Sequence, residues 1–342
     1  MAITRAWPLV RTPSLDAAAH AHLIELLRDP DRARLSHVRA ALSRFGESAS
    51  RVRPFAVLGP PRSRAALQVF ENATKAARDG AFSHFGLALN KRGAVVLLAR
   101  QPLGLGPLKP TSEGYQIRLE GPATARISAW VMGPCPRRDP VDCHALPSLV
   151  GLRRLGTGTW QVDFPVRGTG YWTAEVMADV GLGPEVAFLR HGLAGRPPET
   201  PSEKRRTVEA PTPDRQKSDG PADWLTVLRS VAERSSVDHH PALERAARQH
   251  AEEVCRLGWA LHTGPEGTTP ADRAATQGFQ GRVVESVGVA ESARRAWRVQ
   301  LRSPAHRAGL LDPVATHRGV ALARSGSLRC LVVLLGREKG QW

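Results

Sequence analysis

The sequence predicts an α+β protein of several domains, and three successive residue patterns support this prediction. In residues 1–103, apolar side chains recur at helical spacing and are followed by one apolar strand. Residues 104–192 alternate apolar and polar side chains in short segments separated by Gly and Pro. Residues 224–342 return to helical spacing and end in two apolar strands. A chain of 342 residues, 42% hydrophobic and 23% charged, is long enough for two or three domains with buried cores.

Residues 1–103 form the first predicted domain, an α+β region that repeats part of the C-terminal one. The segment SHFGLAL at 83–89 matches THRGVAL at 316–322, and VVLLAR at 95–100 matches VVLLGR at 332–337. In both copies a glycine-containing strand precedes an apolar strand, as in an antiparallel pair. We therefore interpret this region as a degenerate copy of the C-terminal domain that lacks its site. The alternative is two unrelated strand pairs that are alike by chance.

Residues 104–192 are predicted to form an all-β, immunoglobulin-like sandwich. Alternation of apolar and polar positions is typical of strands with one buried face, and turn residues separate the segments. The sequence of this region contains no catalytic constellation, so spacing or adhesion is its expected role. The clearest alternating apolar positions are Trp160, Val162, Phe164, Trp172, Ala174, Val176 and Ala178.

Residues 193–223 are predicted to be a linker. Six prolines fall between Pro197 and Pro221, charges of both signs are mixed, and almost no residue is apolar. Such a composition favours an extended, mobile segment. The last domain is therefore expected to be tethered to the rest of the chain rather than docked on it.

The C-terminal domain, residues 224–342, is predicted to contain several helices and two final strands. A first helix starts near Trp224, and a second has Pro241 in its first turn and ends at Gly258. Helix-start patterns recur at residue 269, near residue 291 and at residue 303. The two strands are expected at 319–323 and 328–335. Helices on both sides of this sheet would give an α-β-α sandwich.

Four short motifs in this domain resemble the CAP superfamily of cysteine-rich secretory, antigen 5 and pathogenesis-related proteins. They are HTGPEG at 262–267, ES at 285–286, SPAHR at 303–307 and GVA at 319–321. Their order is most similar to the bacterial SCP-like branch, and the resemblance covers about the last third of the chain. It implies an α-β-α fold, a cleft, and roles in ligand or lipid binding, defence or interaction.

Two histidines and one glutamate are the candidate metal ligands: His262, Glu285 and His306. Two imidazoles and one carboxylate suit zinc or a similar divalent cation and leave one position open for water. His306 lies in the first turn of its predicted helix, where the helix dipole disfavours a second proton on the ring. Ser303 and Arg307, which flank His306, are the candidate ligand-binding residues, although Ser303 also fits a helix N-cap.

The resemblance also implies differences from the family pattern. Family members often hold two histidines and two acids, with the second acid shortly after a tryptophan. Here Arg298, Val299 and Gln300 follow Trp297, so that acid has no match. Val284 and Ser286 replace a Gly and an Asn that usually flank the glutamate. The second change concerns the orientation of the Glu285 carboxylate, because residues that contact a metal ligand hold it in position.

Three interpretations of the histidines and the glutamate remain open from sequence. They form a hydrogen-bonded network that orders the loops, they bind a divalent ion, or they catalyse a reaction. The catalytic version is a metal-assisted hydrolase of peptide or cell-wall material, with Glu285 as the base.

The basic residues of the chain raise a further alternative, a nucleic-acid-binding protein. The formal net charge is +16, which suits an anionic partner. However, only six of the 48 basic residues are Lys, and Ala, Gly and Pro are abundant, so background composition also explains the charge. The arginines at 294–307 lack interleaved aromatics beyond one Trp, which favours a solvated face over a nucleic-acid site.

The cysteines and the N-terminus bear on the cellular compartment. Cys135 and Cys143 bracket a polar loop that a disulfide would close in an oxidising compartment. Cys255 and Cys330 fall in a predicted helix and strand and are expected to be buried thiols. No apolar run reaches the roughly 18 residues that span a bilayer, and no secretory signal is visible at the start.

Taken with the resemblance, these patterns predict an exported or envelope-associated protein with a non-enzymatic ligand or interaction module. A small molecule, lipid or cell-wall component is its expected partner, and nucleic acid is not favoured. The expected location, extracellular or in the cell envelope, comes from the resemblance alone.

Overall fold

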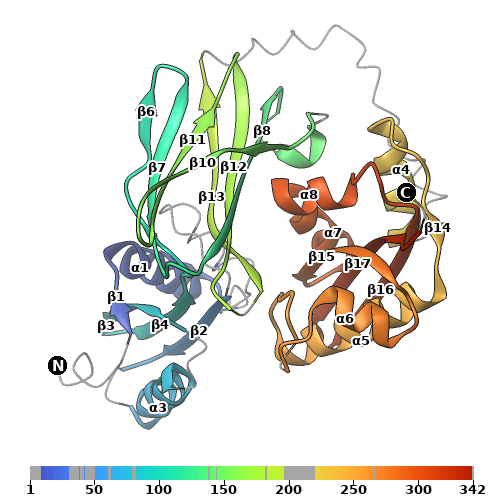
Figure 1. The fold of residues 1–342 in the computed structure, drawn as a ribbon. Coiled ribbons are helices and arrows are strands. Elements are labelled where there is room, and N and C mark those ends of the chain that lie inside the picture. The colour runs from blue at the N-terminus through green and yellow to red at the C-terminus, as the bar shows by residue number, and fades with distance from the viewer. Residues whose placement is uncertain are drawn as a thin grey trace, which may run out of the picture. The chain divides into compact units, whose positions relative to one another are not determined.

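The computed structural model describes residues 9–30, 38, 42, 51–60, 63–78, 82–137, 139–143, 145–181, 183–195, 220–264 and 266–340. The predicted α+β class is confirmed, because helices alternate with strands that form four sheets (Figure 1). The chain divides into two compact units. The first contains residues 1–104 and 186–190, and the second contains residues 105–185 and 191–342.

The first unit packs helices against a four-stranded sheet with the order β1-β3-β4-β2. Helix α1 begins after its N-cap Thr12, and its buried face is continuous with the buried side chains of the central strand. These elements are α1 (Pro13–Arg28), α3 (Arg64–Arg78), β1 (Val10–Arg11), β2 (Arg51–Leu58), β3 (His84–Asn90) and β4 (Gly93–Arg100).

The predicted β-sandwich is present as two sheets. One has the order β10-β11-β7-β5, with β6 paired to β7, and the other has the order β13-β12-β8-β9. The alternating residues of the sequence analysis are buried along β11 and β12. The strands are β5 (Gly104–Leu105), β6 (Lys109–Thr111), β7 (Gly114–Glu120), β8 (Arg126–Cys135), β9 (Ser148–Val150), β10 (Leu152–Gly156), β11 (Thr159–Pro165), β12 (Gly170–Asp179) and β13 (Pro184–Ala194); a short helix, η3, spans Pro140–Asp142.

The C-terminal domain is a three-layer α-β-α structure around a sheet with the order β14-β16-β17-β15. The helices begin close to the predicted starts, but the sequence analysis assigned only two of these four strands. It missed β15, the strand that carries Glu285. The elements are α4 (Pro221–Val231), β14 (Asp238–His239), α5 (Pro241–Leu257), α6 (Pro270–Thr276), β15 (Gly281–Ala290), α7 (Ala293–Arg302), α8 (Pro304–Leu310), β16 (His317–Ser325) and β17 (Leu328–Glu338).

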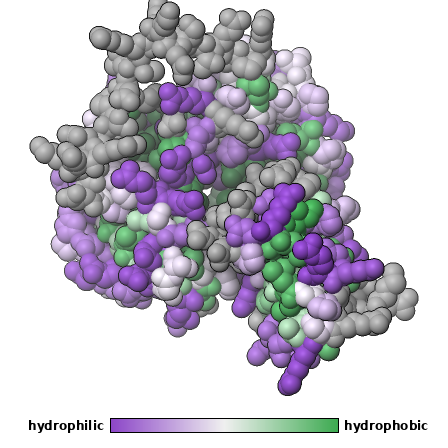
Figure 2. Space-filling model, turned by 180° about the vertical axis from the view of Figure 1, so that it is seen from behind, coloured by the Kyte–Doolittle hydropathy of each residue, from purple (hydrophilic) through white to green (hydrophobic). Residues whose placement is uncertain are grey.

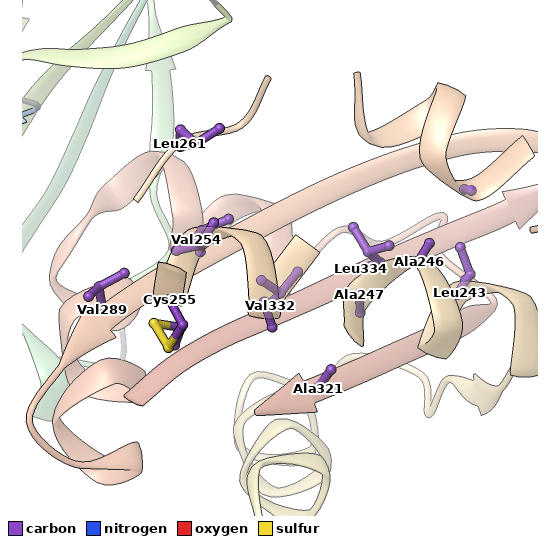
Figure 3. Close-up of a cluster of buried hydrophobic side chains, with 14 of the residues drawn as sticks. Leu243, Ala246, Ala247, Val254, Cys255, Leu261, Val289, Ala321, Val332 and Leu334 are labelled. Carbon is purple, nitrogen blue, oxygen red and sulfur yellow. A yellow bond between two sulfur atoms is a disulfide. The ribbon is translucent and has the colours of Figure 1, made fainter. Parts of the chain in front are cut away.

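Strand β17 forms the centre of this domain because its side chains alternate between two cores. Cys330, Val332 and Leu334 pack with the buried face of α5 (Figure 3). The intervening side chains Leu331 and Val333 pack on the other side with residues of α4, α7 and α8. Both faces of the strand are thus buried, which explains why the sequence reads as one continuous apolar run.

The sheet of the first unit has the same internal topology as the C-terminal sheet. In each sheet the first strand (β1 or β14) has two residues and pairs in parallel with the third strand (β3 or β16). The fourth strand (β4 or β17) lies between the third and the second. Gly86 and Gly319 have the same role, since a Cβ would lie 2.2 Å from the backbone of Leu15 and 2.1 Å from that of Leu243. The two sheets thus agree in strand order and in the role of this glycine, as expected for a repeat. That they arose by duplication stays a prediction.

All four cysteines form disulfides, which corrects one prediction. Cys135 is bonded to Cys143, as the loop between them allows. Cys255 of α5 is bonded to Cys330 of β17, so the expectation of two buried thiols was wrong. The pair is separated by 75 residues and meets only because α5 packs on the central strand.

Two further predictions concern regions that bear on the cellular setting. Within the described ranges, no helix has both the length and the apolar character needed to cross a membrane. Most of the predicted linker, residues 196–219, lies outside the described residues. Figure 2 shows one face of the molecule, on which hydrophilic residues are widespread and several hydrophobic patches lie among them.

Candidate functional site

Three separate elements of the C-terminal domain bring the predicted site residues together. His262 lies in the loop after α5, which ends at Gly258 in the left-handed conformation (φ 82°). Glu285 lies in the middle of β15, and His306 lies in the first turn of α8. Their side chains form one continuous set of contacts.

The contacts form a row of four side chains that starts at His306. The Nε2 atoms of His306 and His262 lie 3.0 Å apart. On the other side of its ring, His262 Nδ1 lies 3.0 Å from Glu285 Oε1. Arg273 Nη2 donates to the second carboxylate oxygen, Oε2, at 2.7 Å. Glu285 is thus held from two sides, and its side chain is 1% exposed.

The charges and hydrogen bonds of the row determine the protonation of Glu285 and of His262 Nδ1. Burial by itself would raise the pKa of Glu285, but the hydrogen bond from His262 and the positive charges of His250, His262 and Arg273 outweigh burial, so the pKa is lowered. Glu285 is therefore a carboxylate, which can only accept, and His262 Nδ1 must carry the donated proton.

His306 is kept neutral by its surroundings. Burial and the nearby charge of His262 lower its pKa to about 3, against the attraction of Glu285. A neutral ring has one nitrogen with a lone pair, so a single proton lies between the two facing Nε2 atoms. The other ring nitrogen, Nδ1 of His306, is buried and has no hydrogen-bond partner in the part of the chain that the structure describes.

Two imidazole nitrogens at this spacing are a candidate pair of cation ligands. Two nitrogens on one tetrahedral zinc lie roughly 3.3 Å apart when each bond is about 2.0–2.1 Å, and the observed separation of the Nε2 atoms is 3.0 Å. Glu285 stands behind His262, on Nδ1, where a carboxylate typically orients a metal-binding histidine. Over the described residues, no cluster of three or more His, Cys, Asp or Glu side chains is arranged to hold a metal. The three-ligand site therefore stays a prediction.

The two candidate ligand-binding residues contact the β-sandwich. Ser303 caps α8 by accepting the N–H of His306 at 3.1 Å, and its hydroxyl donates to Glu175 of β12 at 2.8 Å. The buried guanidinium of Arg307 donates to the carbonyl oxygens of Pro140, at 2.9 Å, and of Cys143. In this structure both side chains hold two domains of the same compact unit together.

Glu175 is a member of the site that the sequence analysis missed. It is fully buried and lies against the first turn of α8. Burial raises its pKa to about 7, although hydrogen bonds from the Ala305 N–H and the Ser303 hydroxyl, and the charge of His262, act in the opposite direction. A single Glu between apolar residues of a strand is the sequence signal that was available.

A cavity of about 580 Å³ opens beside the histidines. One wall comes from the C-terminal domain and includes His262, His306 and Pro313; the other comes from the sandwich and includes Trp130 and Met177. Both walls belong to the second compact unit. Apolar residues supply most of the remaining lining, together with Ser128, Arg234, Arg282 and Asp312.

Comparison with known proteins identifies the domain that carries this site. The model of the cysteine-rich secretory protein family, CAP, matches residues 225–335. The C-terminal domain is a CAP domain. Two solved structures are similar to this chain. An outer surface protein from Borrelia burgdorferi is 23% identical, with 34% of this chain and 90% of that chain covered and a TM-score of 0.32. An extracellular protein containing an SCP domain from Bacillus anthracis is 15% identical, with 68% and 89% covered and a TM-score of 0.31. A search of curated proteins finds no match.

The expectation that the CAP domain is only tethered was wrong. Asp139 of the sandwich forms ion pairs with Arg298 at 2.6 Å and with Arg302 at 2.8 Å. Val141, two residues further on, packs against the core of the CAP domain. The loop closed by the Cys135–Cys143 disulfide thus contacts α7 and Arg307 of α8, whereas α8 also packs on strands β8 and β12.

The same contacts change the interpretation of the basic stretch at 294–307. Its arginines were expected to form a solvated face. Besides the pairs with Asp139, Arg295 pairs with Glu291, and Arg294 lies over the Trp224 ring. Two carboxylates, those of Asp139 and Glu291, thus pair with three of the four arginines of α7, while these arginine side chains stay about half exposed.

Proposed function

We propose that this chain is an exported or envelope-associated protein whose CAP domain binds a ligand in the cavity, with a divalent cation held by His262 and His306. The observation that carries the proposal is the pair of facing Nε2 atoms at the cavity wall, 3.0 Å apart. Both rings are partly buried and line the cavity, where a cation could take the place of the proton that they share.

The residues behind the pair have defined roles in this proposal. Glu285 accepts from His262 Nδ1 and so orients the ring with Nε2 toward His306. Arg273 holds the carboxylate in place, and it acts together with His262 and His250 to keep the carboxylate ionised. Burial keeps His306 neutral, which is the form that binds a metal. A bound cation would supply a positive centre for an anionic or carbonyl group of the ligand.

The proposed ligand is an apolar small molecule or lipid with one polar end. Trp130, Met177 and Leu146 of the sandwich face Pro313 and Leu311 of the CAP domain across the cavity. Burial of an apolar chain between these walls would be favourable, at about 25 cal/mol per Å² of apolar surface removed from water. The polar end would lie at the imidazoles. A cell-wall component with an apolar part also satisfies this chemistry.

The disulfides support export. Disulfides persist in oxidising compartments and are rare in the cytosol, and both cysteine pairs of this chain are bonded. The name of the matched family, cysteine-rich secretory protein, agrees with this location.

Calorimetric titration of the metal-free protein with zinc tests the cation. The wild type is expected to bind one equivalent, and His306→Ala or His262→Ala is expected to abolish binding. His20→Ala is the matched control, because His20 is exposed on α1, outside the site. Zinc binding that survives both site substitutions would overturn the metal part of the proposal.

Displacement of a fluorescent fatty acid, cis-parinaric acid, tests the apolar ligand. Trp130→Ala removes part of the cavity wall and is expected to weaken binding at least fivefold. Leu155→Ala on strand β10 of the other sheet is the control, since this side chain is 44% exposed and does not line the cavity. Equal affinities for wild type and Trp130→Ala would remove the apolar-ligand part.

A further inference from the structure

The β-sandwich places one carboxyl group at the edge of the CAP site. Glu175 lies on β12 directly opposite Trp130 on β8. Side chains of opposite residues in an antiparallel pair lie on the same face of the sheet. Trp130 lines the cavity, so Glu175 also lies on the face that α8 covers, while its neighbours Ala174 and Val176 point into the sandwich core.

Among the described residues, the side chain of Glu175 forms its hydrogen bonds with the turn that carries His306. Its Oε2 accepts the backbone N–H of Ala305 at 2.8 Å. The Ser303 hydroxyl donates to the carboxyl group, at 2.8 Å from both oxygens. The same Ser303 oxygen accepts the N–H of His306. One buried carboxyl group thus fixes two of the three residues before His306.

We propose that Glu175 is a positioning residue of the CAP site, which holds the His306 ring against His262 through Ser303 and Ala305. The metal part of this inference rests on the proposed function. The sandwich then contributes a residue to the site, and its contact with α8 sets the relative position of the two imidazoles.

The burial of this group agrees with such a role. A fully buried carboxyl group is costly unless hydrogen bonds satisfy it, and here its protein donors are Ser303 and Ala305. The titratable groups in the row of the CAP domain are His262, His306 and Glu285. Of these, the charge of His262 lowers the pKa of Glu175, against the effect of burial. A role in docking alone would not require a contact with the histidine-bearing turn.

Three variants of the full chain separate positioning from docking. Glu175→Ala removes every acceptor and is expected to weaken zinc binding by about 10–100-fold, as loss of a group that orients a ligand does. Glu175→Gln keeps one acceptor oxygen and is expected to weaken it by less than about tenfold. Asp139→Ala breaks two ion pairs between the same domains but touches neither Ser303 nor His306. It is expected to leave zinc affinity within about threefold of wild type.

The closing experiment records imidazole ¹⁵N NMR spectra of these proteins without metal and then with zinc. Positioning predicts that Glu175→Ala moves or broadens the His306 and His262 signals in the metal-free protein, whereas Asp139→Ala does not. Unchanged signals in Glu175→Ala, or the same change in Asp139→Ala, would overturn the inference. If the wild type fails to bind zinc, the proposed function fails, and the metal-free spectra still decide whether Glu175 positions the pair.

Discussion

Replacement of Glu175 by Gln is predicted to change how the stability of the protein depends on pH. The folded-state pKa of Glu175 is raised from 4.5 to about 7, mainly by burial. Between these values the folded protein binds a proton at this site and the unfolded chain does not. The free energy of unfolding therefore falls as the pH rises through this window, by about 1.4 kcal/mol per pH unit. Over the whole window the loss is about 3 kcal/mol. Gln cannot titrate, so the variant lacks this loss.

His306 acts in the opposite direction, and its contribution is present in both proteins. Its pKa is lowered from 6.5 to about 3, so stability from this group is present above pH 6.5 and is lost as the pH falls toward 3. The two slopes nearly offset each other between pH 4.5 and 6.5 in the wild type. In Glu175→Gln only the His306 slope remains, so the variant is expected to gain stability with rising pH in that window, relative to the wild type.

The assay is urea unfolding followed by tryptophan fluorescence at pH 4.5, 5.5, 6.5 and 7.5. The wild-type free energy minus that of Glu175→Gln should decrease by about 3 kcal/mol from the lowest to the highest pH. Glu252→Gln, on the exposed side of α5, is the control and should give a constant difference. A difference for Glu175→Gln that stays flat, or that increases with pH, would refute the reasoning.

Three other predictions follow from the packing of the CAP domain. Replacing Cys255 and Cys330 by Ala opens a loop of 75 residues and is expected to cost about 4 kcal/mol, measured by urea unfolding; a loss below about 1 kcal/mol would contradict it. Gly319→Ala places a Cβ 2.1 Å from the backbone of Leu243 and is expected to cost roughly 1–3 kcal/mol or more, seen as a lower midpoint of thermal unfolding; an unchanged midpoint would count against this packing. Arg307→Leu leaves two carbonyl oxygens of the sandwich loop without their donor and is expected to raise hydrogen exchange in residues 139–143, whereas unaltered exchange would argue against the docked arrangement.

Local patterns in the sequence were sufficient for much of the fold. The alternation of Trp172, Ala174 and Val176 gave the buried face of β12, and the N-caps Thr269 and Ser303 gave the starts of two helices. Both kinds of pattern depend on neighbours within a few residues. The resemblance to the CAP family gave the candidate set of His262, Glu285 and His306, which no spacing rule would have grouped.

Contacts between distant residues account for what the sequence analysis missed. Alternation correctly places Glu175 on the outward face of β12, but only docking of α8 buries that face. The arginine of the SPAHR motif, Arg307, was expected near a ligand because it adjoins His306, yet its donors reach the carbonyls of a loop 164 and 167 residues away. Cys255 and Cys330 gave no spacing signal, since their bond depends on which helix covers the central strand.

X-ray absorption spectroscopy of the protein loaded with one equivalent of zinc tests the central claim most directly, because it counts the imidazoles around the metal. The account predicts two imidazole nitrogens at about 2.0–2.1 Å and no sulfur, with one imidazole lost in His306→Ala. A spectrum with no imidazole, or one that His306→Ala and His262→Ala leave unchanged, would contradict the claim that these two facing rings form the binding centre of the CAP domain.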